Sequence, residues 1–336
     1  MRDRPSTAPE AGPPARATSA HRVSIVVRCF NEERMIGRLL SGIAAQTRPP
    51  DEIVIVDSGS TDRTVEIARR HPVQVHSIDP AEFSFGRSLN RGIEVATGDV
   101  VVMASAHVYP LFDTWLEHLT RPFDDDDVAL TYGRQVGGPT TPYSESQILA
   151  TWFPAHSQPR QAHPFANNAN AAIRRSEWQT LPYDEDLTGL EDLDWASRAL
   201  DRGKRIAYVA EAPVVHLHDE RFAQTRNRYR REAIAHRRIF KDPKMGRLEA
   251  ARLFVANVVS DYVHAARDGE LHRHVLDIPR FRGAQFLGTY EGFSQRGEVP
   301  QELRRRFYYP RGIRRREPKR DDIGSPIVYD DLAEPH

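Results

Sequence analysis

The sequence predicts an α/β fold in which helices flank a mostly parallel β-sheet. Two observations support this fold class: short apolar runs alternate with helical segments over about eighty residues, and the runs are largely continuous. Continuous apolar strands are typical of a parallel sheet that is covered on both faces. The four predicted strands are residues 23–27, 53–56, 73–78 and 100–104.

The segments between these strands carry helix signals. Apolar residues recur at helical spacing from Met35 to Ile43, and Asn31 ahead of them is expected to cap this helix. A second helix is expected around residues 65–68 and a third at about 86–96. Gly98-Asp99 then turns the chain into the fourth strand, so strands and helices alternate throughout.

The pattern is less regular after residue 110. Helices are predicted at 112–119, 191–201 and 222–268, and short strands at 128–132, 206–209 and 214–218. Residues 133–166 are rich in Gly, Pro, Thr, Ser and His, and we expect a long loop there. We therefore divide the chain into four parts: a disordered arm at 1–20, an α/β domain at 21–222, a helical C-terminal extension at 223–294 and a weakly ordered tail at 295–336.

Composition excludes several classes of protein. With 39% hydrophobic residues among 336, the chain can bury a substantial core. Lys+Arg and Asp+Glu both number 47, which disfavours nonspecific nucleic-acid binding. A single cysteine, Cys29, excludes an intrachain disulfide and a multi-cysteine zinc site. No apolar stretch approaches the roughly 20 residues of a transmembrane helix, and no signal-peptide core is present, so we expect a cytoplasmic protein.

Polar clusters follow three of the predicted strands. They are Cys29-Phe30-Asn31-Glu32, Asp57-Ser58-Gly59-Ser60-Thr61-Asp62 and Ser105-Ala106-His107. Open parallel sheets bind ligands outside the carboxyl ends of their strands, so these clusters are candidates for one site. Simple turn and helix-cap roles remain an open alternative for each cluster taken alone.

The segment Val23 to Glu33, together with Ile53 to Asp62, resembles the opening of the family 2 glycosyltransferases. The resemblance continues through residues 86–92, 96–99 and 189–195, and covers about 22–220, roughly sixty per cent of the chain. These enzymes have the GT-A fold and use nucleotide-sugar donors. The resemblance therefore implies a GT-A domain that binds a UDP-, dTDP- or GDP-sugar.

The resemblance also implies roles on the donor side. Asp57 occupies the position of the acid that binds the nucleotide base in the family. Glu32 matches an acid near the base and ribose, and Arg87 matches a basic residue near the donor. An ordinary exposed helix residue is the alternative for Arg87. Asn168 lies in an amide-rich segment, where it is expected either to bond to sugar hydroxyls or to cap its own loop.

The segment Glu191-Asp192-Leu193-Asp194-Trp195 resembles the acidic motif near the acceptor in this family. Asp192 matches the general base that removes the acceptor hydroxyl proton, and Glu191 is a neighbour that could bind the acceptor. An acidic first helical turn is the structural alternative, since such residues complement the helix dipole.

The sequence departs from the family at the metal motif. Ser105-Ala106-His107 replaces the usual aspartate-any-aspartate, and we still place these residues at the nucleotide sugar. His216 and His218 lie two apart on a predicted strand and share a face. We expect one or two of the histidines His107, His216 and His218, together with the diphosphate itself, to bind a divalent cation. Mn²⁺ is favoured over Mg²⁺ because imidazole is a poor Mg²⁺ ligand. Neutralisation of the diphosphate by arginines at 226–231 is the competing account.

These observations predict an inverting glycosyltransferase that acts on a hydroxyl of a sugar, a lipid-linked glycan or a small molecule. Cell-envelope polysaccharide and glycosylated-metabolite synthesis are both open as its pathway. A non-catalytic nucleotide-sugar-binding protein is one alternative, and a nucleotidyltransferase that makes sugar nucleotides is another. A homodimer and a peripheral contact with the inner face of the membrane also stay open.

Overall fold

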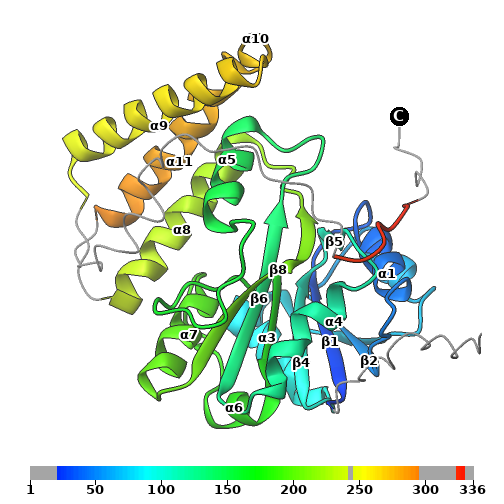
Figure 1. Cartoon of the computed structure of the whole chain (residues 1–336). Coiled ribbons are helices and arrows are strands. Elements are labelled where there is room, and N and C mark those ends of the chain that lie inside the picture. Colours follow the sequence, from blue (N-terminus) through cyan, green and yellow to red (C-terminus); the bar gives the residue numbers. More distant parts are fainter. Residues whose placement is uncertain (1–20, 241–244, 295–322, 330–336) are drawn as a thin grey trace, which may run out of the picture.

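The computed structural model describes residues 21–240, 245–294 and 323–329. The expected arm at 1–20 and most of the expected tail lie outside these residues. One mixed eight-stranded sheet forms the centre of the described chain, and Figure 1 shows three long helices gathered to one side of it. Within the described ranges, no helix combines the length and the apolar character that a bilayer span requires.

The sheet confirms the predicted parallel order of the first four strands. Its strands are β1 (Val23–Cys29), β2 (Glu52–Asp57), β3 (Gln74–Ser77), β4 (Val100–Ser105), β5 (Val108–Pro110), β6 (Val128–Val136), β7 (Asn170–Arg174) and β8 (Arg205–His216). They are arranged as β3-β2-β1-β4-β7-β6-β8-β5. Pairing is parallel from β3 to β4 and between β6 and β8, and antiparallel where β7 meets β4 and β6 and where β5 meets β8.

Helices cover both faces of this sheet. They are α1 (Ile36–Ala44), α2 (Thr64–Ala68), α3 (Phe85–Val95), α4 (Trp115–Thr120), α5 (Tyr143–Trp152), α6 (Arg175–Thr180), α7 (Glu191–Asp201), α8 (Phe222–Phe240), α9 (Arg247–Arg267), α10 (Leu271–His274) and α11 (Asp277–Phe293), with single 3₁₀ turns at Pro80–Glu82 and Arg121–Asp124. Strand side chains alternate between the faces. Ile25 of β1 therefore packs with α1 and α4, whereas Val26 packs with α3 and α7.

Two local expectations are wrong, and one strand was not expected. Asn31 does not cap α1: it has a φ of 55°, its side-chain oxygen accepts a hydrogen bond from the Thr61 amide at 2.8 Å, and the helix begins at Ile36. The expected loop at 133–166 contains α5, whose buried face includes the polar residues Ser144 and Glu145. Those residues bond to other helices, so α5 lacks the apolar period by which a helix is recognised in sequence. The strand that was not expected is β7.

The C-terminal helices form a bundle around α11. Helix α11 lies within the predicted helical extension, beyond the helix expected at 222–268. It packs closely on α8, because Gly288 and Gly292 face the α8 backbone without a side chain. Phe286 and Phe293 fill a small core there with α9. A second contact joins α5 to the bundle through Ile148. The bundle therefore holds α8 rigidly beside the carboxyl ends of the strands.

Candidate active site

A cavity of about 320 Å³ opens beside the carboxyl ends of β1, β4 and β8. Loops after β1 and β4, the start of α7, the end of β8 and one face of α8 all contribute to its wall. The cavity brings together eight of the predicted site residues: Glu32, Ser105, His107, Asn168, Glu191, Asp192, His216 and His218. The three other predicted residues, Asp57, Arg87 and Ala106, do not line it.

Asp192 is held in a fixed orientation at the first turn of α7. Its Oδ2 accepts a hydrogen bond from the Asn168 amide at 3.0 Å, and its Oδ1 accepts one from the Leu193 amide at 2.7 Å. The Asn168 side chain in turn donates to Glu191 at 3.4 Å and accepts from the Tyr183 hydroxyl at 3.1 Å. Asn168 therefore positions both acids.

The environment of Asp192 suits a proton acceptor near neutral pH. Burial and, after it, the negative charge of Glu191 raise the pKa of Asp192 to about 7, although the two amide hydrogen bonds and Arg28 oppose that rise. A general base works best when its pKa is close to the working pH. Cys29 offers no such chemistry, because burial and the neighbouring Asp57 raise the pKa of its thiol and keep it protonated.

Three histidines meet at the other part of the cavity wall, and their potential ligand atoms all lie within 4.8 Å of one another. Each has its Nδ1 at hydrogen-bond distance from an oxygen acceptor: His107 from Glu32 at 2.8 Å, His216 from Gln135 at 2.6 Å and His218 from Glu145 at 2.8 Å. Because these oxygens can only accept, each Nδ1 carries a proton, and in a neutral ring the Nε2 then keeps a free lone pair.

This arrangement fits a metal site. Burial lowers the pKa of His216 and of His218 well below the usual value, and the positive charges of neighbouring groups, Arg228 among them, act in the same direction. Both rings are thus neutral, as ligation requires. The Nε2 of His216 is buried and has no hydrogen-bond partner among the described residues. Oxygen partners on the second ring nitrogen are typical of metal-binding histidines.

Asp57 does not line the cavity, although its neighbour Ser58 does. Its carboxylate is buried at the end of β2 and accepts hydrogen bonds from the amides of Gly59 and Ser60, both at 3.1 Å. Those bonds close the turn after the strand. A role in reading the nucleotide base stays a prediction. Ala106 is likewise buried between the two site-lining residues of its cluster.

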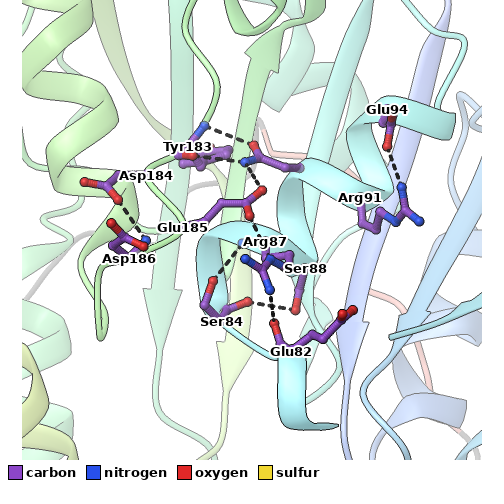
Figure 2. Close-up of polar contacts among 11 residues, drawn as sticks. Glu82, Ser84, Arg87, Ser88, Arg91, Glu94, Tyr183, Asp184, Glu185 and Asp186 are labelled. Carbon is purple, nitrogen blue, oxygen red and sulfur yellow. Dashed lines mark hydrogen bonds and ion pairs between the residues drawn. The ribbon is translucent and has the colours of Figure 1, made fainter. Parts of the chain in front are cut away.

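Arg87 also does not line the cavity, and Figure 2 shows the polar contacts that engage its side chain. Its Nε donates to Glu185 at 2.7 Å and its Nη1 donates to the carbonyl of Glu82 at 2.9 Å. The side chain of Arg87 is 42% exposed. In this structure, Arg87 therefore ties the start of α3 to the loop that precedes α7.

Two arginines outside the main set of predicted site residues also line the cavity: Arg28 at the end of β1 and Arg231 of α8. Arg231 belongs to the arginines at 226–231 that form the competing account of the diphosphate site, whereas Arg28 was not predicted. Within the basic patch at 226–231, Arg230 is exposed, and Arg228 is buried in ion pairs with Glu145 and Glu220, both at 2.8 Å. No sequence signal indicates Glu145 of α5, whose carboxylate contacts both Arg228 and His218.

Residues 24–177 match the model of a protein family described as glycosyl transferase family 2. Among curated proteins, the chain is similar to the O-antigen chain rhamnosyltransferase RfbN of Salmonella typhimurium, with 25% identity over 215 residues, 59% of this chain and 67% of the relative. It is also 30% identical over 200 residues to the O-antigen chain rhamnosyltransferase WbaN of Salmonella anatum, covering 55% of this chain and 62% of that protein. The matches thus span about two thirds of these relatives.

One solved structure with a similar fold is the mannosyltransferase PcManGT from Pyrobaculum calidifontis, in complex with GDP-Man and Mn²⁺. Its TM-score is 0.54 at 23% identity, over 82% of this chain and 86% of that one. The similarity extends beyond the strands into the C-terminal half of the chain.

Proposed function

Because the chain belongs to the family 2 glycosyltransferases and has their GT-A fold, we propose that it transfers a sugar from a nucleoside diphosphate to an acceptor hydroxyl with inversion. One observation carries this proposal: a buried carboxylate with a pKa of about 7 and a three-histidine cluster line the same cavity. The carboxylate suits the acceptor side of such a reaction, and the cluster suits the leaving diphosphate.

In the proposed reaction, Asp192 accepts the proton of the acceptor hydroxyl as that oxygen attacks the anomeric carbon. The bond between the anomeric carbon and the diphosphate oxygen breaks, and its electron pair leaves with the nucleoside diphosphate. Attack from the face opposite the leaving group inverts the configuration. The amides of Asn168 and Leu193 keep the Asp192 carboxylate aimed during this step.

The three histidines would hold a divalent cation through their Nε2 atoms. When bound, such a cation neutralises the negative charge that develops on the departing diphosphate. The donor set contains nitrogen only, which favours Mn²⁺ over Mg²⁺. Glu32, Ser105 and Asn168 line the space available to the nucleotide sugar, and we assign them to donor binding.

The two curated relatives are named as O-antigen chain rhamnosyltransferases. We therefore propose nucleotide-activated rhamnose as the first donor to test and a cell-envelope glycan as the first acceptor. Donors with UDP, dTDP and GDP belong in the same screen. A protein that only binds nucleotide sugars would bind one of these donors without forming product. A nucleotidyltransferase would instead release pyrophosphate from a nucleoside triphosphate.

Replacement of the base tests the proposal. Asp192→Asn keeps the shape of the side chain and removes the proton acceptor, so turnover should fall by about 10²–10⁴-fold while donor affinity stays close to that of the native chain. Asp194→Asn is the matched control, since Asp194 lies on the same helix, pairs with Arg198 at 2.7 Å and does not line the cavity. Near-native turnover of the Asp192 variant would reject this assignment.

A further inference from the structure

We propose that Arg28 and Arg231 form a subsite for an anionic group, a phosphate or a carboxylate, on the acceptor. This inference rests on the proposed function, because Asp192 defines which side of the cavity the acceptor occupies. Neither arginine belongs to the acid pair or to the histidine cluster. The subsite would give the enzyme a preference for charged acceptors over neutral ones.

The two arginines are held by one aromatic ring. The guanidinium carbon of Arg28 lies 5.1 Å from the centre of the Phe85 ring, and that of Arg231 lies 5.2 Å from it. Phe85 is the first residue of α3, and its helix start is capped by Ser84. Attraction between a cation and the ring fixes the guanidinium groups but leaves their N–H edges able to bind an anion.

Arg231 has unused hydrogen-bonding capacity. Among the described residues, its side chain makes no hydrogen bond and no ion pair within 4 Å, and its Nε is buried without a partner. Buried donors are almost always satisfied in folded proteins, so this vacancy points to a ligand. Arg28 has only long contacts, at 3.6 Å to Glu191 and 3.5 Å to the Phe85 carbonyl. Arg228, by contrast, is already paired with two carboxylates.

The acidic residues of the cavity leave room for an anion at this pair. Two of them bond elsewhere, Glu32 to His107 and Glu220 to Arg228. Burial raises the pKa of Asp192 and of Glu232 to about 7, which reduces their negative charge at neutral pH. Among the described residues, only Glu191 forms an ion pair with an arginine of the pair. Asp192 and Glu232 act on Arg28 and Arg231 through their charges, which are reduced at neutral pH.

The pair lies on the acceptor side of the cavity. Arg28 contacts Glu191, which is the direct neighbour of the proposed base. The carbonyl of Arg231 accepts a hydrogen bond from the Thr188 hydroxyl at 3.2 Å, which ties α8 to the loop just ahead of α7. Both arginines are thus anchored to the segment that carries Asp192, whereas the histidines are anchored to Glu32, Gln135 and Glu145.

The subsite can be tested without any turnover. Inorganic phosphate is titrated by calorimetry into the full chain at constant ionic strength, with EDTA present so that no metal can bind the phosphate. We expect Arg231→Gln and Arg28→Gln to weaken phosphate binding at least tenfold, and Arg231→Lys to weaken it less. Arg230→Gln is the matched control, because Arg230 is an exposed neighbour on α8 that does not line the cavity. Its affinity should equal that of the native chain.

A second titration separates the acceptor from the donor as the source of the anion. UDP, dTDP and GDP are titrated with Mn²⁺ into the same variants, and their affinities should change less than twofold. If these affinities fall as much as the phosphate affinity, the arginines hold the donor diphosphate and the proposal is wrong. Phosphate that does not bind the native chain, or that binds all variants alike, also overturns it. If Asp192→Asn keeps near-native turnover, the phosphate and nucleotide affinities of the arginine variants are not affected by that result. The assignment of Asp192 as the base and the proposal of the arginine subsite can therefore fail independently.

Discussion

Asp192 has a raised pKa because folding removes it from water and places it beside Glu191. A base must be deprotonated to act, so the pKa of about 7 predicts a limb on the acidic side of the pH–rate profile. Below that pH, turnover should fall about tenfold per pH unit, and above it turnover should level off. The profile of kcat/KM with saturating metal measures this directly. A flat profile between pH 5 and 8 would exclude Asp192 as the base.

Glu191 is expected to set the position of that limb. Its negative charge raises the pKa of Asp192, so Glu191→Gln should lower this pKa and move the acidic limb to lower pH. Asp194→Asn, which removes a charge from the same helical turn outside the cavity, should leave the limb in place. An unshifted limb in the Glu191 variant would mean that burial alone controls the pKa.

The oxygen partners of the histidines are expected to control metal affinity. Gln135 accepts a hydrogen bond from the Nδ1 of His216, and this bond fixes which nitrogen is free. Gln135→Ala should therefore weaken Mn²⁺ binding by about 10–100-fold. Calorimetric titration of Mn²⁺ without donor is the measurement, and Gln74→Ala, at an exposed glutamine of β3, is the control. Equal Mn²⁺ affinities would show that the cluster holds no metal.

At the scale of elements, the contact between α8 and α11 depends on glycine. A Cβ on Gly288 would meet the backbone carbonyl of Arg226, so Gly288→Ala should force the helices apart and destabilise the fold by about 1–3 kcal/mol. Gly283→Ala on the same helix is the control, since its nearest neighbour is 3.9 Å away. That change should be neutral or stabilising by up to about 1 kcal/mol. Thermal and urea unfolding compare them, and equal stabilities would contradict the packing argument.

The same contact explains why α11 is hard to predict from sequence. Its buried residues include polar and small ones such as Arg282 and Gln285, alongside the glycines. Arg282 is buried because it pairs with Asp261 of α9 at 2.7 Å. Nothing in the sequence indicates that Arg282 and Asp261 form an ion pair. Strands β1, β2 and β4, by contrast, are recognisable because burial on both faces requires apolar residues throughout.

At the scale of the whole molecule, residues 323–329 lie against the N-terminal half of the chain. Ile323 is buried, Pro326 forms a β-bridge with Phe112, and the Tyr329 hydroxyl donates to the carbonyl of Pro110. Figure 1 shows this segment beside α1 and β5. The segment therefore packs against the edge strand β5 and the residues that follow it.

Ile323→Ala should lower the free energy of unfolding by about 2 kcal/mol, because a buried aliphatic side chain is lost. Val328→Ala is the matched control, since Val328 is 87% exposed and its truncation should change stability by less than about 0.5 kcal/mol. Urea unfolding measures both changes. If the two variants are equally stable, this segment contributes nothing to the fold.

The sequence by itself indicated the α/β class, the resemblance to the family 2 glycosyltransferases and eight of the residues that line the cavity, because strand burial and strand-end chemistry leave local patterns. Asp192 and Glu191 were predicted from the family resemblance and the histidines from their places after strands, and the roles of all five stay predictions. Only the tertiary structure decided that Asp57 and Arg87 do not line the cavity. It also brought Arg231 and Glu145 to the site from helices far along the chain. The physical reason is that the role of a polar residue depends on the groups that it contacts, and these groups come together only when the helical bundle packs against the sheet.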